Sequence, residues 1–348
     1  MKITKENFGT DSQGQNISAY TITNQSGASI TVLDYGAILK NVCVPDRMGN
    51  LRDVVLGYDE LASYEVNPPF FGATIGRNGN RIDGRGFKLN GSICCLARNE
   101  NDRVNLHSGP MGFEKRFFAA RPEKAAGRVT FSLLSPDGDQ GFPGQLRVQV
   151  GYTFTEDNTI RITYDGIADQ DTILNMTNHS YWNLDGAGHG LILQHCLQLE
   201  ADAFTPIDDY MIPTGELRPV AGTPFDFRAG KSVAQDAQAE DEQLGHAGGY
   251  DHNFVLRGKG FRCAARLESK TSGIRLEVYT DQPGLQVYAG NFISGPAGKG
   301  GAEYLPHSGI ALETQHFPDA VHQPGFASTV LPAGEKYHTV TEYRLGKK

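Results

Sequence analysis

The stretch QLRVQVGYTFTEDNTIRITYDG, residues 145–166, alternates apolar and polar side chains on both sides of one short polar break. Leu146, Val148 and Val150 occupy every second position before the break, and Ile160 and Ile162 resume the same period after it. Apolar residues at every second position predict β-strands with one buried face. The break at 155–158 is a turn signature, so the stretch predicts an antiparallel hairpin.

The same two-residue period recurs in RVTFSL (128–133) and in GIRLEVYT (273–280), with turn residues between the runs. Repeated short strands of this kind predict an all-β fold, a large antiparallel β-sandwich. Helical patterns are few, and we expect short helices only within 59–65 and 231–244. Neither a repeat nor a Pro/Ser-rich linker interrupts the chain, so we predict a single domain spanning residues 1–348.

Composition limits the kinds of molecule that this protein can be expected to bind. The 348 residues carry a formal net charge of −8, which argues against a nucleic-acid partner because binding phosphates needs a concentrated basic face. Residues 1–12 lack the apolar core of a secretory signal, and no run of about 18 apolar residues predicts a membrane span. The five cysteines form no Cys-x-x-Cys pair, so we expect reduced thiols in a cytoplasmic protein.

The segment NMTNHSYWNLDG, residues 175–186, places a polar face on a predicted strand. Asn175, Thr177, His179 and Tyr181 lie two residues apart and therefore share one side of the strand. Such a face meets bulk water or lines a wet pocket. For His179 the alternative remains open that neighbouring Asn and Ser groups satisfy a purely structural histidine.

Glu313 ends an apolar run in SGIALETQHFPDA, residues 308–320, where burial of a carboxylate is expensive without partners. A surface glutamate on an edge strand is an equally good interpretation of this segment alone. Glu313 and His316 have the Glu-x-x-His spacing of di-iron helices, but a strand turns them to opposite faces. We therefore expect no metal site.

Three further segments carry hydrogen-bonding side chains on glycine-rich turns. Asn80 and Arg81 lie in 75–91, which lacks the glycine spacing of a phosphate-binding loop. His107 lies in NLHSGPMGF (105–113), and Asp251 follows Gly-Gly-Tyr in GGYDHNFVL (248–256). Donors and acceptors mixed in this way suit the hydroxyl groups of a neutral sugar.

Together these segments resemble the aldose 1-epimerase (galactose mutarotase) family from about residue 35 to the C-terminus. The resemblance is carried by an ordered series of motifs: GRNGNRI (76–82), NLHSG (105–109), NHSYWNL (178–184), IPTGE (212–216), GTPFDFR (222–228), GGYDHNFVL (248–256), PGLQVYAGNF (283–292) and LETQHFPDAVHQP (312–324). Eight motifs in the family's order make the match highly specific.

The resemblance implies a galactose mutarotase-like supersandwich that interconverts the α and β anomers of free aldohexoses such as galactose and glucose, without a cofactor. It implies Glu313 as general base and His179 as general acid, with His107 as a second donor to the substrate. The substrate-binding residues that it implies are Asn80, Arg81, Asp251 and Gln286.

The sequence also departs from the family pattern. Trp182 stands where phenylalanine is usual, Ser108 replaces a glycine, and Gly79 stands where alanine is common. Gln286 also occupies a position that varies among members of the family. These departures leave open which aldose is preferred and whether phosphorylated sugars are accepted. The expected partner is a small monosaccharide, not a nucleic acid or a membrane, and a monomer and a homodimer remain equally open.

The implied reaction needs an ionised Glu313 beside a charged His179, so we expect the carboxylate to raise the pKa of the histidine above its ordinary value. Two other classes of protein remain alternatives. A non-catalytic carbohydrate-binding sandwich would not need both groups. A polysaccharide hydrolase would need two carboxylates flanking the bond, for which only Glu313 and Asp251 are candidates.

Overall fold

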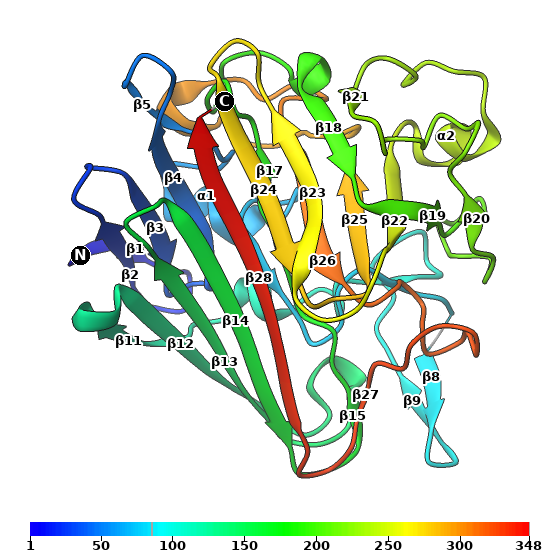
Figure 1. Ribbon diagram of the computed structural model, residues 1–348. Helices are drawn as coiled ribbons and strands as arrows, with labels where there is room; N and C mark the ends of the chain where they lie inside the picture. The colour runs from blue at the N-terminus through cyan, green and yellow to red at the C-terminus, as the bar shows by residue number, and fades with distance from the viewer. Residues whose placement is uncertain (85, 348) are drawn as a thin grey trace.

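The computed structural model describes residues 1–84 and 86–347, and two large antiparallel sheets dominate it (Figure 1). The strands of the nine-stranded sheet are, in spatial order, β11 (Ala119–Glu123), β12 (Arg128–Ser135), β13 (Leu146–Phe154), β14 (Thr159–Ala168), β28 (Lys336–Lys347), β24 (Ile274–Thr280), β23 (Arg262–Glu268), β18 (Cys196–Leu199) and β21 (Lys231–Ser232). Those of the six-stranded sheet are β17 (Tyr181–Trp182), β26 (Ile310–Gln315), β25 (Gly284–Tyr288), β22 (Asp251–Leu256), β19 (Ala201–Phe204) and β20 (Arg218–Pro219).

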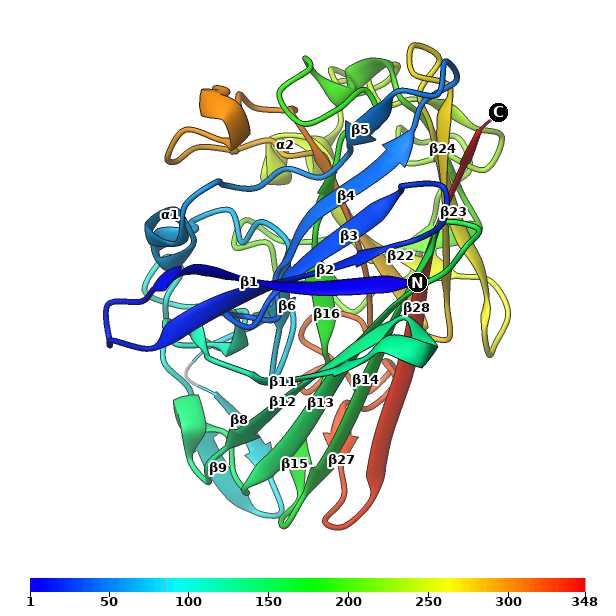
Figure 2. The same ribbon diagram turned by 90° about the vertical axis from the view of Figure 1, so that its left-hand side faces the viewer.

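The chain begins with a five-stranded sheet that faces the viewer in Figure 2. Its strands follow one another in sequence: β1 (Lys2–Thr10), β2 (Asn16–Thr23), β3 (Ser29–Leu33), β4 (Leu39–Pro45) and β5 (Leu51–Asp53). It joins the nine-stranded sheet through the core, where the Tyr20 and Phe131 rings meet edge to face with centroids 5.8 Å apart.

Short strand pairs and helices complete the structure. The four pairs are β6 (Ala73–Ile75) with β16 (Thr177–His179), β7 (Arg81–Ile82) with β10 (Asn105–Leu106), β8 (Gly86–Leu89) with β9 (Ser92–Cys95), and β15 (Thr172–Ile173) with β27 (Val330–Leu331). The helices are α1 (Leu61–Val66), α2 (Glu242–Ala247) and the 3-10 turns η1 (Phe113–Lys115), η2 (Lys124–Ala126), η3 (Asp139–Gly141), η4 (Ile192–Gln194) and η5 (Lys299–Gly301). Across 1–84 and 86–347, no helix has both the length and the apolarity to cross a membrane.

The main core fills the space between the two large sheets. Tyr343 of β28 donates its hydroxyl to the carbonyl oxygen of Leu312 in β26 at 3.0 Å, and its ring packs on Trp182 of β17 at 4.8 Å. Both aromatic residues are almost fully buried within one continuous hydrophobic cluster. The six-stranded sheet is thus covered on one face, and its other face is free to build a site.

Most of the predicted elements are confirmed. The hairpin is β13 and β14, paired from Leu146–Ala168 to Phe154–Ile160, and the all-β class holds throughout. The predicted helix at 59–65 is confirmed as α1.

The predicted helix at 231–244 is wrong over most of its length. Residues Lys231 and Ser232 pair with β18, and helix α2 begins only after Asp241. The Asp241 side chain caps it by accepting hydrogen bonds from the backbone N–H groups of Gln243 and Leu244. Strand pairing therefore overrides helix propensity at the start of this alanine- and glutamine-rich segment, and the Asp241 cap sets where the helix begins.

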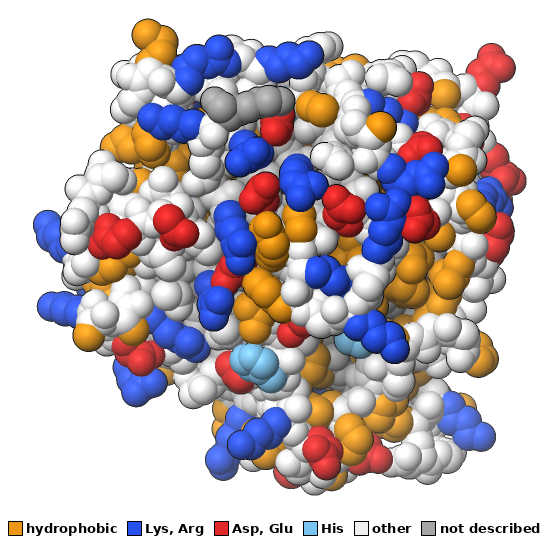
Figure 3. Space-filling view, viewed as in Figure 1, with side chains coloured by type: hydrophobic (Ala, Val, Ile, Leu, Met, Phe, Trp, Pro, Cys, Tyr) orange, Lys and Arg blue, Asp and Glu red, His pale blue; other side chains and the backbone are white. Residues whose placement is uncertain are grey.

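The outer face of the nine-stranded sheet carries charges of both signs side by side (Figure 3). Glu342 pairs with Arg161 at 2.5 Å and with Arg344 at 2.6 Å, and Glu277 pairs with Arg266 at 3.3 Å. Because acidic groups lie beside these basic ones, this face does not form the concentrated basic surface that phosphate backbones need.

Candidate active site

A pocket of about 260 Å³ opens on the face of the six-stranded sheet that turns away from the main core. Six of the seven predicted site residues line it: Asn80, Arg81, His107, His179, Asp251 and Glu313. The seventh, Gln286, is buried behind them and donates its amide to Asp251 at 2.6 Å. The pocket therefore brings together residues from six separate stretches of sequence.

Strand β26 is buried on both faces, and its alternation determines which way the Glu313 side chain points. Leu312 belongs to the main core and Thr314 contacts Thr341 of β28, so the even-numbered side chains face the nine-stranded sheet. Glu313 points the other way, with 2% of its surface exposed. Because β26 lies between β17 and β25, the alternative of a surface glutamate on an edge strand is wrong.

Neighbouring strands extend the same face. Glu313 lies opposite Gln286 of β25, which in turn lies opposite Asn253 of β22. Asp251 and Tyr288 form the next row. Residues opposite one another in a ladder share a face, so the register alone aligns these polar groups along the floor of the pocket.

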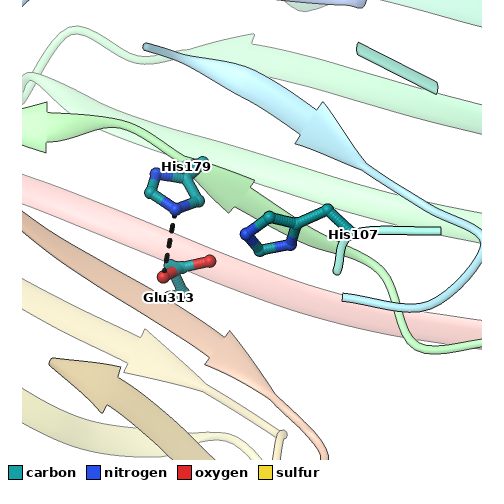
Figure 4. Close-up of side chains that lie close together, drawn as sticks. All are labelled: His107, His179 and Glu313. Atoms are coloured by element: carbon teal, nitrogen blue, oxygen red, sulfur yellow. Dashed lines mark ion pairs between the residues drawn. The ribbon is translucent and has the colours of Figure 1, made fainter. Parts of the chain in front are cut away.

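His179 reaches Glu313 from the end of β16. Its Nε2 lies 3.5 Å from Oε1 of Glu313, and the two side chains point toward one another (Figure 4). The imidazole packs beside the rings of Tyr181 and Phe70, at centroid distances of 5.0 and 5.8 Å. These aromatic walls hold the histidine against the carboxyl group.

The polar face predicted for 175–181 is confirmed, but one detail of it is wrong. Asn178 and Ser180 point to the opposite face, where the Asn178 amide donates to the carbonyl oxygen of Gly72 and its oxygen accepts from Ser180. They therefore do not orient or satisfy His179. Its Nδ1 has no hydrogen-bond partner within the described part of the chain.

His107 completes the group and is fixed by Asn80. The backbone N–H of Asn80 donates to Nδ1 of His107 at 3.1 Å, and the N–H of His107 donates to the Asn80 carbonyl at 3.0 Å. Both residues adopt left-handed backbone angles, φ 61° for Asn80 and 52° for His107. Since Nδ1 is an acceptor, the neutral ring carries its proton on Nε2 and is a hydrogen-bond donor there.

Arg81 and Asp251 form the polar end of the pocket. Arg81 donates to both oxygens of Glu100, from Nε at 2.7 Å and from Nη2 at 2.9 Å. Its Nη1 lies 4.0 Å from Oδ2 of Asp251. Glu100 was not predicted, because nothing in the turn that carries it distinguishes it from a solvated surface glutamate.

Burial controls the protonation of the central pair. It lowers the pKa of His179 to about 4 and raises the pKa of Glu313 well above its ordinary value, with the nearby Asp251 carboxylate adding to the rise. The pKa of His107 also falls well below its usual range. Burial is the main cause, and the electrostatic interactions with His179 and Arg81 lower it further. The expectation that Glu313 would raise the pKa of His179 is therefore wrong, since desolvation opposes the charged form of both groups.

His107, His179 and Glu313 each present a possible ligand atom within 4.8 Å of the others, the donor set of many zinc enzymes. The hydrogen bonding does not fit a metal ion. The lone pair on Nδ1 of His107 already accepts the Asn80 N–H, and Nε2 then carries a proton. The cluster is better suited to moving protons than to holding a cation.

Two of the sequence departures lie away from the pocket lining. Trp182 faces the main core against Tyr343. Ser108 accepts from the backbone N–H of Asn78 at 2.7 Å and donates to its carbonyl oxygen at 3.1 Å, so it stabilises a loop. Of Trp182, Ser108 and Gln286, only Gln286 has a direct link to a pocket side chain.

Comparisons with known proteins give one consistent result. A family model described as "Aldose 1-epimerase" matches residues 18–344. Bovine (Bos taurus) galactose mutarotase is 44% identical over 91% of this chain and 90% of its own length, and aldose 1-epimerase from Escherichia coli is 39% identical over 95% and 96%.

Solved structures agree. The aldose epimerase homologue from C. elegans superposes with a TM-score of 0.87 at 32% identity, covering 94% of this chain and 98% of its own. Galactose 1-epimerase from Lactobacillus acidophilus superposes with a TM-score of 0.88 at 28% identity, covering 100% and 99%.

Proposed function

The chain belongs to the aldose 1-epimerase family, and from this premise we propose that it interconverts the α and β anomers of free aldohexoses such as galactose and glucose. It is an isomerase. The observation that carries the choice of residues is the 3.5 Å contact between Nε2 of His179 and Oε1 of Glu313 in a polar pocket.

The reaction requires paired proton transfers. In the opening step Glu313 takes the proton of the anomeric hydroxyl, the C1–O1 bond becomes a carbonyl, and the bond from C1 to the ring oxygen breaks. His179 gives its proton to the ring oxygen as that bond breaks. Rotation about C1–C2 then presents the other face of the aldehyde, and the same two groups return their protons as the ring closes.

Burial favours the neutral form of both groups of the proposed acid–base pair. Once the ring is open, Glu313 is protonated and His179 is neutral, which is the arrangement that burial favours for both groups. The charged arrangement, with a carboxylate beside an imidazolium, contains the same single proton. The sugar must therefore stabilise the charged arrangement for opening to begin, and the pair returns to the arrangement that burial favours as the ring opens.

The remaining polar groups bind and orient the sugar. His107 donates from Nε2 to the ring or anomeric oxygen, and Asn80, Arg81 and Asp251 hold the hydroxyls, which raises the rate by fixing the reacting geometry. Gln286 takes part through its hydrogen bond to Asp251. Phe70 and Tyr181 supply apolar walls beside His179.

The charge of the pocket supports an uncharged substrate. Within 1–84 and 86–347, Arg81 is the only lysine or arginine in the lining, against the three carboxyl groups of Glu100, Asp251 and Glu313. A sugar phosphate would meet more negative than positive groups. We also propose a cytoplasmic location, which the five free cysteines support.

Polarimetry on freshly dissolved α-D-galactose and α-D-glucose tests the proposal. The protein should shorten the approach to anomeric equilibrium and release no new sugar, after subtraction of the buffer's own catalysis. Glu313→Gln protein is the matched control. An unchanged rate with every common aldose would instead indicate a carbohydrate-binding module.

A further inference from the structure

Two ion pairs of opposite polarity join β7 to the turn that precedes β10. Inside the pocket, Arg81 donates through Nε and Nη2 to both oxygens of Glu100. Outside it, Arg103 of the turn donates to both oxygens of Asp83, at 2.6 and 2.8 Å. The two pairs have the same bidentate geometry, but only the first lines the pocket.

The inner pair determines which part of Arg81 meets a ligand. Because Nε and Nη2 donate to Glu100, Nη1 is the guanidinium nitrogen that is left to bind a ligand in the pocket. Nη1 lies 4.0 Å from Oδ2 of Asp251, while Oδ1 of Asp251 accepts the amide of Gln286 at 2.6 Å. A separation of 4.0 Å is too long for a direct hydrogen bond.

A hydroxyl group has the chemistry to bridge these two atoms. It can accept from Nη1 of Arg81 and donate to Oδ2 of Asp251, because it combines one donor with two acceptor lone pairs. A phosphate oxygen can accept from the arginine but has no proton for Asp251. The charge on Glu100, with 22% of the side chain exposed, further offsets the cation that would attract a phosphate.

We propose that Glu100 is a positioning residue that holds Arg81 so that this end of the pocket selects a neutral sugar hydroxyl over an anion. The proposal rests on the proposed function for its substrate. Glu100 acts through Arg81 and takes no part in proton transfer, so it affects binding more than turnover.

Glu100→Gln tests this with galactose as substrate and inorganic sulfate as the anionic probe. Loss of one charge-assisted pair should raise KM at least about tenfold and leave kcat nearly unchanged, the signature of lost binding without lost chemistry. Sulfate should become a competitive inhibitor of the variant while inhibiting the unaltered protein weakly. Glu100→Asp, which keeps the carboxylate, should restore much of the affinity and the resistance to sulfate.

Asp83→Asn is the matched control, since it breaks the outer pair of the same geometry and leaves Arg81 untouched. It should alter neither KM nor sulfate inhibition. Equal kinetics for Glu100→Gln and the unaltered protein would overturn the proposal. Strong competitive inhibition of the unaltered protein by sulfate would also overturn it, and this measurement does not depend on the folding of any variant. Absence of any mutarotation by the unaltered protein would instead contradict the proposed function, and sulfate titration by calorimetry would still test Glu100.

Discussion

Glu313 is a carboxyl group with almost no access to solvent, and its nearest acid–base partner is the His179 imidazole. Glu313→Gln keeps the shape of the side chain and removes the base. We expect kcat to fall by at least about 100-fold, the low end for a positioned acid–base group, with sugar affinity retained. His179→Asn should give a loss of the same size.

Polarimetric kcat and calorimetric sugar binding, measured on the same samples, check this prediction. Near-normal turnover in Glu313→Gln would mean that the carboxyl group is structural.

The pair also predicts the pH dependence of kcat/KM. Activity needs the pair to hold a single proton. A second proton binds as the pH falls through the His179 pKa of about 4, which leaves no base, and the single proton leaves as the pH rises through the elevated pKa of Glu313, which leaves no acid. We expect a bell-shaped profile with an acid limb near pH 4, whose limbs belong to the pair as a whole.

The profile is measured with buffer catalysis subtracted, and His179→Asn, which removes one member of the pair, should abolish the bell shape. An acid limb near the ordinary histidine pKa in the unaltered protein would contradict the effect of burial.

Glu114 in η1 is a second buried carboxyl group, and it affects stability. Burial raises its pKa to about 7, and its Oε2 has no hydrogen-bond partner among the described residues. Because the folded state holds the proton more tightly than the unfolded state, stability is fully present below the ordinary glutamate pKa and falls as the pH rises toward 7.

Glu114→Gln has no proton to lose, so it should become the more stable protein at alkaline pH, by roughly 3 kcal/mol at most. Urea unfolding of both proteins at about pH 5 and about pH 8 measures this, and the difference should be far smaller at the lower pH. A difference that does not change with pH would show that Glu114 titrates normally.

At this scale the sequence predicted the identity of the site residues better than their charge states. The motifs NHSYWNL and LETQHFPDAVHQP singled out His179 and Glu313 through their resemblance to the family, whereas the strand pattern alone left a structural interpretation of each residue open. Their pKa directions could not be predicted, because desolvation depends on Phe70, Tyr181 and neighbouring strands that are distant in sequence.

Among the elements, β17 illustrates how strand alternation separates site from core. Tyr181 faces the pocket and Trp182 faces the main core. Trp182→Phe should therefore leave the ratio of kcat/KM for galactose and glucose unchanged. It should lower stability by about 1–2 kcal/mol, because the smaller ring leaves a cavity.

Kinetics with both sugars and urea unfolding check this prediction. A changed sugar ratio would show that the core behind β17 controls the shape of the pocket.

The strands themselves were largely predictable, and their order was not. The β13–β14 hairpin is local, so alternation and the turn at 155–158 are sufficient to predict it. In the order β17-β26-β25-β22, the first two strands, Tyr181–Trp182 and Ile310–Gln315, lie far apart in sequence. The registers of β22, β25 and β26 place Asp251 and Gln286 near Glu313. Local sequence carries no information on such registers.

For the molecule as a whole, the single domain spanning 1–348 stays a prediction. One hydrophobic cluster includes side chains from the five-, six- and nine-stranded sheets. We expect one cooperative unfolding transition, in which the fluorescence of the single tryptophan and far-UV circular dichroism change together. Two separated transitions, or a calorimetric enthalpy above the van't Hoff value, would indicate independent domains.

The position of β28 has a consequence for biosynthesis. This strand comes later in the sequence than both of its neighbours, and it pairs with β14 on one side and β24 on the other. On the ribosome, both neighbours leave the exit tunnel before the strand that must join them, and each presents an unpaired edge that can bind another chain. The nine-stranded sheet therefore closes only once β28 has been made, and until then the open edges of β14 and β24 are sites at which the chain can misassemble.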